Sequence, residues 1–224
     1  MTAIIPDGAT ETITARDADA VRAFVRRHDG NRNIYYSVNP TRDEMSSKAA
    51  KKDIAKIEYL LADLDPRDGE TPEAAKARYL AALKDGKPAF TAMVDSGNGL
   101  QALWKLADPI VLPDPAAPEW AQVVGDIEAR MKAQMERLGS VAGTQNIDRI
   151  LRLPGTVNIP SRAKLKAGRV ACPTRLIEFN GATCSLEDFP AATAKEKQAD
   201  NANSASFADT GQFANVEPDD PRLT

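Results

Sequence analysis

The sequence predicts an α+β fold, in which helices and strands mix along the chain. Amphipathic stretches with helical periodicity alternate with short runs rich in β-forming residues. Two of these runs flank an Asn-Gly turn, which predicts an antiparallel hairpin. The 224 residues suffice for one large domain or two small ones. Together these observations favour an α+β or mixed α/β domain.

The first part of the chain predicts two helices and two strands. Apolar residues recur at helical spacing over residues 15–28, and an Asp-Gly-Asn sequence ends this helix. Residues 34–38 are rich in β-formers and are closed by Asn-Pro, so they predict a strand. The Lys-rich residues 47–59 are expected to form a second helix. An apolar run over residues 60–65 then predicts a buried strand.

The middle of the chain predicts two helices that flank a hairpin. A Thr-Pro pair, which supplies a cap and a first-turn proline, starts a helix over residues 71–84. Strands are expected over residues 88–95 and 100–106, joined by the turn at residues 96–99. A long helix is expected over residues 118–138.

The last part of the chain predicts short strands and a tail. Residues 150–153 form a short strand before Pro-Gly, and residues 170–179 supply one or two more. We assign residues 1–192 to one domain. Residues 193–224 are polar, acidic and poor in large apolar side chains, so we expect a disordered tail or linker.

The composition excludes several classes of protein and site. No run of about 18 apolar residues occurs, so no membrane span is expected. Two cysteines, Cys172 and Cys184, make neither a disulfide framework nor a four-ligand zinc site. His28 is the only histidine, which excludes a multi-histidine metal site. A reducing, cytoplasmic setting fits this composition best.

Two carboxylates at the end of the strand at residues 60–65 are the strongest chemical signal. Asp63 and Asp65 are two apart, so in a strand they project from the same face. Such a pair is costly unless a cation lies between the charges, and hard oxygen ligands suit Mg²⁺ or Mn²⁺. The alternative is a pair of turn-capping aspartates. A phosphatase of the haloacid dehalogenase type is disfavoured, because Arg67 stands where that class has Thr or Val.

The turn at residues 96–99 is the second signal. Glycines at 97 and 99 permit positive φ and a close approach of backbone N–H groups to an anion. Neutral hydrogen-bonding side chains flank these glycines, so the segment is suited to cradle a triphosphate. The alternative is an ordinary hairpin turn.

The third signal is a segment with one acid and two arginines. Asp148 is a candidate third metal ligand. Arg149 and Arg152 are three apart, so on an extended strand they face opposite sides, and at least one is expected to reach phosphate. The alternative is a surface salt bridge from Asp148 to a nearby arginine.

A basic stretch follows these segments. Residues 139–175 contain seven Lys and Arg against Asp148 alone, a local charge of 7 − 1 = +6. Such a stretch can contact nucleic-acid phosphates although the whole chain is acidic. The alternative is a solvated basic face. The candidate nucleic-acid contacts are Arg162, Lys164, Lys166 and Arg169.

In this order and spacing, the three segments resemble the archaeo-eukaryotic primase (AEP) superfamily. The resemblance is to the RepB-like primase-polymerase domains of phage and plasmid replication proteins, and it spans residues 32–160. It implies a catalytic sheet like that of the RNA-recognition motif (RRM-like), packed against a second small α/β unit.

The resemblance also implies roles for the candidate residues. The catalytic carboxylates, which bind Mg²⁺ or Mn²⁺, are Asp63, Asp65 and Asp148. The residues that bind the incoming nucleotide are Ser96, Gly97, Asn98, Gly99, Gln101, Arg149 and Arg152. Many members carry a phosphate-binding histidine near the position of Gln101, and glutamine cannot carry positive charge. Triphosphate binding is then expected to use Gln101 itself, Lys105, or the backbone and arginines.

The implied activity is that of a DNA primase or polymerase, a nucleotidyltransferase that copies a single-stranded DNA template from nucleoside triphosphates. Two other functions stay open: a non-catalytic, single-stranded-DNA-binding replication initiator, and a metal-dependent nuclease or phosphatase. The chain has no Gly-x-x-x-x-Gly-Lys-Ser/Thr motif, so a helicase is expected as a further domain or a partner. A phage- or plasmid-encoded protein in the bacterial cytoplasm is expected.

Overall fold

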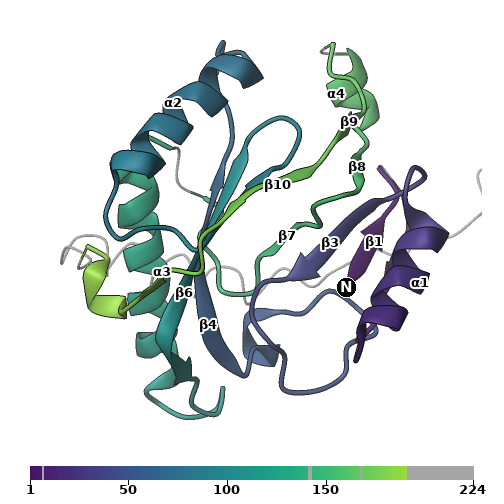
Figure 1. Ribbon diagram of the computed structural model, residues 1–224. Coiled ribbons are helices and arrows are strands. Elements are labelled where there is room, and N and C mark those ends of the chain that lie inside the picture. The colour runs from purple at the N-terminus through teal and green to yellow at the C-terminus, as the bar shows by residue number, and fades with distance from the viewer. Residues whose placement is uncertain (7, 141–142, 167, 191–224) are drawn as a thin grey trace, which may run out of the picture.

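The fold combines antiparallel sheets with helices, which confirms the α+β prediction (Figure 1). The computed structural model describes residues 1–6, 8–140, 143–166 and 168–190. The predicted tail at residues 193–224 lies outside the described residues. Within them, no helix has the length and apolar character needed to cross a membrane.

Most of the expected helices and strands are present, and several short strands join them. Two 3₁₀ turns, Lys51–Asp53 and Leu186–Asp188, accompany the helices and strands. In chain order the described helices and strands are β1 (Thr2–Ile4), β2 (Thr10–Thr12), α1 (Ala18–His28), β3 (Asn33–Ser37), β4 (Lys56–Leu64), α2 (Pro72–Asp85), β5 (Ala92–Asp95), β6 (Leu100–Val111), α3 (Trp120–Arg137), β7 (Ile150–Arg152), β8 (Val157–Asn158), α4 (Arg162–Lys166), β9 (Cys172–Pro173), β10 (Arg175–Phe179) and β11 (Thr183–Cys184).

The larger unit is built on the long strand β6. Over the described residues, its sheet has the order β10-β5-β6, with β4 antiparallel along the other edge of β6 and β11 parallel to the middle of β6, at Lys105 and Leu106. Helices α2 and α3 lie together on one side of this sheet (Figure 1). Leu60, Ala62 and Leu64 alternate along β4 and are fully buried. Asp63, which lies between them, therefore projects from the opposite face of the sheet.

The sequence specifies α2 locally and through one buried face. Thr71 caps the helix by accepting a hydrogen bond from the N–H of Ala74 (3.2 Å), and Pro72 occupies the first turn. Ala75, Tyr79 and Leu83 recur at four-residue spacing and are buried in the main core. Burying a large apolar side chain contributes roughly 1.5–3 kcal/mol, so this face fixes α2 on the sheet.

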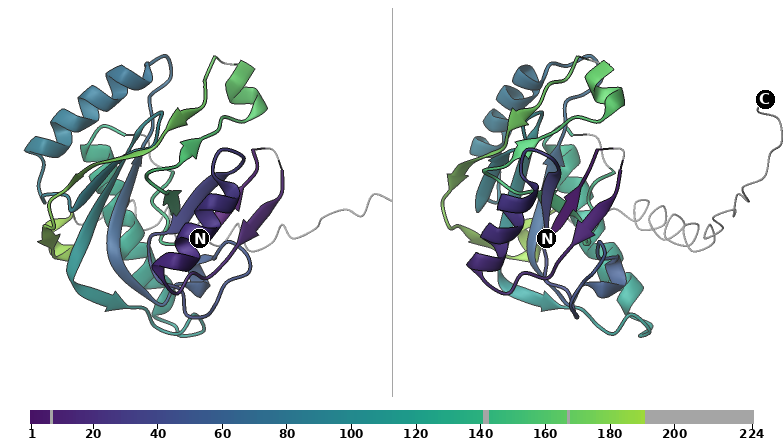
Figure 2. Two further views of the ribbon diagram at one scale, coloured as in Figure 1. Left: turned by 45° about the vertical axis from the view of Figure 1, so that its right-hand side comes forward. Right: turned by 90° about the vertical axis from the view of Figure 1, so that its right-hand side faces the viewer.

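The smaller unit is a sheet of order β2-β1-β3-β7, with α1 packed on it (Figures 1 and 2). Its core is separate from the main core and consists of Ala3, Phe24 and Ile34. Asp17 caps α1 by accepting a hydrogen bond from the N–H of Ala20 (2.8 Å). The two units correspond to the predicted catalytic sheet and second α/β unit.

The side chain of Asn39 joins the two units. It accepts hydrogen bonds from the N–H groups of Glu58 (2.9 Å) and Tyr59 (3.0 Å), and its amide donates to the carbonyl of Tyr59 (3.1 Å). These backbone groups lie at an irregularity in β4, where the pairing with β6 shifts between Ile57 and Tyr59. Asn39 follows β3, so it ties the smaller sheet to the strand that carries Asp63.

The predicted helix over residues 47–59 is wrong. Residues 51–53 form a single 3₁₀ turn, in which the N–H of Ala50 donates a hydrogen bond to the Asp53 carboxylate (2.8 Å). β4 then begins at Lys56. The spacing of Ile54 and Ile57 within a Lys-rich stretch suggested a helix. Pairing with the twelve residues of β6 outweighs that local preference, because it buries Ile57 and extends the sheet.

Other elements differ in extent. The strand expected from residue 88 begins at Ala92, and the one or two strands expected over residues 170–179 are the two strands β9 and β10. The short elements β1, β2, β8, β11 and α4 were not predicted, because strands of two or three residues carry too little periodicity to be recognised.

Replacing Asn39 with alanine is expected to destabilise the protein by about 3 kcal/mol, since it leaves three backbone groups of β4 without their partner at about 1–3 kcal/mol each. Urea denaturation measures the loss. Asn31→Ala, at an exposed turn position, is the matched control and is expected to change stability by less than about 0.5 kcal/mol. Equal effects of the two substitutions would contradict this role of Asn39.

Candidate active site

A polar cavity of about 400 Å³ gathers residues from separated segments of the chain. They include the three segments singled out in the sequence and two residues of the basic stretch, together with residues of β1 and β3 and one residue of the segment before β4. Its charged and polar lining consists of Tyr35, Lys48, Asp63, Asp65, Ser96, Asn98, Gln101, Asn146, Arg149, Arg152, Asn158, Lys164 and Arg169.

The pairing of β4 with β6 places Asp63 directly opposite Gln101. The Gln101 amide donates to one Asp63 oxygen (3.2 Å), and the guanidinium of Arg149 donates to the other (2.6 Å). The Asp63 side chain is 14% exposed and that of Arg149 is 28% exposed. Both carboxylate oxygens of Asp63 thus have protein partners, one neutral and one cationic.

Asp65 lies one residue beyond the end of β4 and faces the same cavity. Its pKa is raised, first because the surrounding protein displaces bulk water and second because Asp63 carries like charge. The nearby cations Lys164 and Arg169 act in the opposite direction. The two aspartates therefore share one site at an electrostatic cost.

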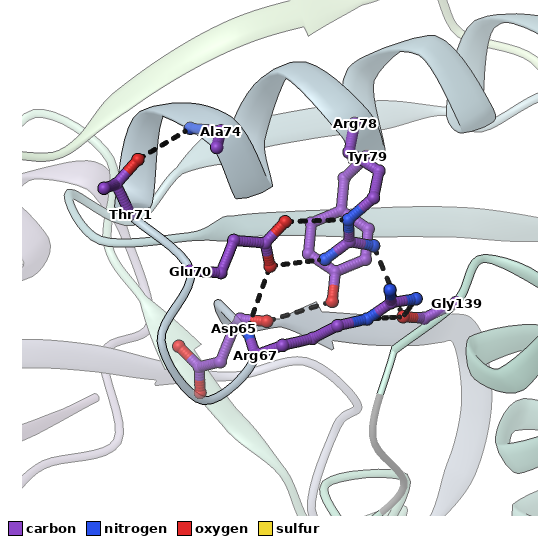
Figure 3. Close-up of polar contacts among 8 residues, drawn as sticks. All are labelled: Asp65, Arg67, Glu70, Thr71, Ala74, Arg78, Tyr79 and Gly139. Carbon is purple, nitrogen blue, oxygen red and sulfur yellow. Dashed lines mark hydrogen bonds and ion pairs between the residues drawn. The ribbon is translucent and has the colours of Figure 1, made fainter.

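The backbone of Asp65 is fixed from the helix side of the sheet (Figure 3). The hydroxyl of Tyr79 in α2 donates to the Asp65 carbonyl (2.9 Å), and the Tyr79 side chain is fully buried. The guanidinium of Arg78 lies 4.0 Å from the centre of the Tyr79 ring. This contact makes α2 the support for the strand end that carries Asp65.

A second set of contacts closes the loop that follows Asp65 (Figure 3). Glu70 accepts the N–H of Arg67 (3.0 Å) and two hydrogen bonds from Arg78 (2.9 and 2.7 Å). These bonds, those from Arg78 first, lower the pKa of Glu70 to about 2. Arg67 and Arg78 both donate to the carbonyl of Gly139 beyond α3. Arg67, which disfavoured a phosphatase of the haloacid dehalogenase type in the sequence, therefore has a structural contact here.

Asp148 lies beside the cavity and not in its lining. Its carboxylate accepts hydrogen bonds from Lys48 (3.1 Å) and Asn146 (2.6 Å), which both line the cavity. The N–H of Ile147 is held by the buried carboxylate of Glu128 (3.0 Å). Across the part of the chain that the structure describes, no three His, Cys, Asp or Glu side chains are grouped to hold a metal. The structure thus brings Asp63 and Asp65 together, and Asp148 is paired with Lys48.

The turn at residues 96–99 is a hairpin turn whose glycines are required by packing. Gly97 has φ +97°, and its N–H donates to the side chain of Asp95 (2.8 Å). A Cβ on Gly97 would lie 2.4 Å from the sulfur of Cys172, and one on Gly99 would lie 2.4 Å from the carbonyl of Leu64. Gly99 thereby lets the turn lie against the strand end that carries Asp65. Contact of these glycines with a nucleotide stays a prediction.

Two buried polar atoms at Asp63 have no partner within the described residues: the carbonyl oxygen of Gln101 and the Nε of Arg149. Gln101 is only 3% exposed. Buried polar groups are almost always satisfied, so an unpartnered acceptor and an unpartnered donor beside Asp63 are unusual. Gln101 lines the cavity with a neutral amide, where the resemblance led us to expect a histidine.

Both arginines of the third segment reach the cavity, against the expectation that they face opposite sides. Arg149 precedes β7 in a turn closed by its own N–H on the carbonyl of Asn146 (3.1 Å), so strand alternation does not apply to it. Arg152 lies opposite Tyr35 in the β3–β7 pairing, and its guanidinium is 4.7 Å from the Tyr35 ring. Arg152 also donates to the side chain of Asn33.

The described residues 159–166 and 168–171 of the basic stretch form an arm between β8 and β9 that projects from the rest of the fold (Figures 1 and 2). Lys164 and Arg169 line the cavity, whereas Arg162 and Lys166 belong to the exposed helix α4. Asn33 holds the start of the arm by pairing with the N–H (2.7 Å) and carbonyl (2.9 Å) of Ile159.

The sequence missed Lys48, Asn146 and Asn158 as cavity residues. Lys48 lies in the segment wrongly predicted as a helix, and its partner is a hundred positions away. No local signal distinguished it from the neighbouring lysines. Asn158 donates to the carbonyl of Ser96 (2.7 Å), so its role also depends on a distant contact.

Comparison with solved structures finds domains of the same kind. The AEP domain of the cyanophage S-2L primase-polymerase (PrimPol) is 16% identical, with a TM-score of 0.52 over 84% of this chain and 87% of that one. Primase RepB′ gives a TM-score of 0.47 at 14% identity, over 92% of this chain and 58% of that one. The catalytic domain of primase RepB′ in complex with initiator DNA gives 0.45 at 14% identity, over 94% and 89%. No family model and no curated protein matches the sequence.

Removing the hydroxyl of Tyr79 is expected to loosen the strand end that carries Asp65. Tyr79→Phe deletes the hydrogen bond to the Asp65 carbonyl and should cost about 1 kcal/mol in urea denaturation. Amide hydrogen exchange of Arg67 and Glu70 should accelerate, because their loop loses its anchor. Tyr59→Phe is the control, since the Tyr59 hydroxyl has no hydrogen bond within the described residues. Identical exchange in both variants would contradict the role of Tyr79.

Proposed function

We propose that this chain, which has the fold of an AEP domain, is a DNA primase or polymerase that transfers nucleotides onto a growing strand. The observation that carries the proposal is that Asp63 and Asp65 share a cavity whose other charged lining residues are all cations, beside the unpartnered oxygen of Gln101. Carboxylates that bind metal and cations that bind phosphate are the two components of a nucleotidyl-transfer site.

The residues of the cavity fit Mg²⁺ or Mn²⁺. The donors are the carboxylates of Asp63 and Asp65 and the open carbonyl oxygen of Gln101, all hard oxygen ligands. When bound, the metal would lower the pKa of the attacking 3′-hydroxyl and stabilise the leaving pyrophosphate. Asp148 completes the site in this proposal, once its carboxylate leaves Lys48.

Cationic side chains of the cavity would bind the triphosphate. Arg149 has an open Nε, and Arg152 is held against Tyr35 with its guanidinium at the cavity wall. A guanidinium group can bind two phosphate oxygens at once. This contact orients the nucleotide and neutralises part of its negative charge. Ser96, Asn98 and Gln101 add neutral contacts. These residues replace the phosphate-binding histidine expected from the resemblance.

The basic arm is proposed to bind the single-stranded DNA template. Residues 159–171 contain four Lys or Arg and no acidic residue. Lys164 and Arg169 face the cavity, so a strand held by the arm would lead toward the carboxylates. A helicase, as a further domain or a partner, and a phage or plasmid origin stay predictions.

A second candidate function is a non-catalytic, single-stranded-DNA-binding initiator. The contact that favours it is the ion pair between Asp148 and Lys48, which leaves two carboxylates in the cavity instead of three. This candidate predicts DNA binding without nucleotide incorporation. A nuclease or phosphatase on the same carboxylates would shorten the substrate and not extend it.

With Mg²⁺ or Mn²⁺, a single-stranded template and nucleoside triphosphates, the protein is expected to synthesise or extend oligonucleotides. The double substitution Asp63→Ala and Asp65→Ala should reduce synthesis at least about 1,000-fold, since metal stabilisation of the transition state is worth several kcal/mol. Asp85→Ala with Asp108→Ala, two exposed acids outside the cavity, is the control. Undiminished synthesis by the first pair would refute the assignment.

Template binding is expected to weaken with salt and to depend on the arm. The triple substitution of Lys164, Lys166 and Arg169 with glutamine should lower the slope of log affinity against log salt by about 2, at roughly 0.7 per phosphate contact on single strands. Fluorescence anisotropy with labelled DNA measures it. Replacing the exposed Lys52, Lys84 and Lys87 with glutamine is the control, and an equal effect there would contradict a specific role for the arm.

A further inference from the structure

Two of the three candidate metal ligands already have a cation of the protein as partner. Arg149 lies 2.6 Å from Asp63, and Lys48 lies 3.1 Å from Asp148. The two carboxylate side chains are 14% and 12% exposed, so the carboxylates are largely shielded from water, whereas the Lys48 side chain is 45% exposed. Both cations line the cavity, where the proposed function would have them bind phosphate.

We infer that Arg149 and Lys48 occupy the place of the divalent metal in the ligand-free protein, so that metal and nucleotide bind as one unit. A metal can take Asp63 and Asp148 only if the two displaced cations find another anion. The triphosphate that arrives with the metal supplies that anion. This inference rests on the proposed function, and it adds that metal alone binds poorly.

The charge of the cavity supports this coupling. Five Lys and Arg side chains line it against two carboxylates, a balance of 5 − 2 = +3. A divalent cation entering alone would raise that positive charge further, in a site partly withdrawn from water. A nucleoside triphosphate brings more negative charge than one divalent metal can balance. The combination brings the cavity closer to neutrality, whereas the metal alone moves it further away.

The geometry of Arg149 fits a partner that can be exchanged. The guanidinium uses one Nη to hold Asp63, and its Nε is buried with no partner. A permanent ion pair would satisfy both groups through a two-pronged contact with the carboxylate. A phosphate group can provide such a contact, so Arg149 gains hydrogen bonds when it passes from Asp63 to the nucleotide.

A purely structural ion pair predicts the opposite response to removal of the arginine. If Arg149 only stabilised the fold, Arg149→Gln would weaken binding of every ligand or leave it unchanged. If Arg149 competes with the metal, the same substitution frees Asp63 and tightens binding of metal alone. It also removes a phosphate contact and weakens binding of the nucleotide. Tighter binding of metal alone together with weaker binding of nucleotide is expected only if Arg149 competes with the metal for Asp63.

The test measures Mn²⁺ binding by electron paramagnetic resonance, and binding of a non-hydrolysable triphosphate analogue at saturating Mn²⁺ by calorimetry. Arg149→Gln is expected to bind Mn²⁺ alone about tenfold more tightly than the natural protein, and the analogue at least about tenfold more weakly, each a change of about one charged contact. Arg137→Gln, at an exposed position at the end of α3, is the matched control and should change neither affinity.

If Arg149→Gln does not fold, Lys48→Gln provides the same test, since it frees Asp148 and lies at a more exposed side chain. Unchanged or weaker Mn²⁺ binding in the substituted protein overturns the inference, and leaves the proposed function intact if the natural protein still extends primers. Failure of the natural protein to bind Mn²⁺ with or without the analogue overturns both.

Discussion

The pairing of β4 with β6 is the constraint on which the rest of the site depends. Its register sets Asp63 opposite Gln101 and ends β4 at Leu64, opposite Leu100. A shift of one residue would turn Asp63 toward the core and a leucine toward the cavity. The missing side chain of Gly99 then allows the turn after β5 to close against this strand end. One strand pair thus places both the carboxylates and the turn beside them.

The smaller unit supplies the cations, and its attachment determines where they lie. Asn39 holds it to β4 through three hydrogen bonds, and β7 brings Arg149 to Asp63. The cavity therefore forms at the junction of the two units, with acids mainly from the larger and bases mainly from the smaller unit and the arm. Relative movement of the units would separate these charges, so the junction would determine the proposed activity as well as stability.

The sequence predicted those features of the fold and site that are encoded locally. The helices over residues 15–28, 71–84 and 118–138 have caps or strong periodicity, and the Asp63–Asp65 pair follows from spacing alone. The predicted start of this strand, at residue 60, was wrong, because pairing with β6 outweighs the helical pattern of residues 47–59 and β4 begins at Lys56. The partners of Asp148 and the packing role of Gly97 depend on contacts with Lys48 and Cys172, which no local pattern reveals.

We propose that the cavity holds a divalent metal together with a nucleotide. Crystals grown with Mn²⁺ and a non-hydrolysable triphosphate would test this, because the anomalous signal of manganese locates the metal. We expect an anomalous peak about 2.0–2.2 Å from carboxylate oxygens of both Asp63 and Asp65, the distance typical of small hard cations, with phosphate oxygens at Arg149. Manganese bound elsewhere, or a nucleotide outside the cavity, would contradict it.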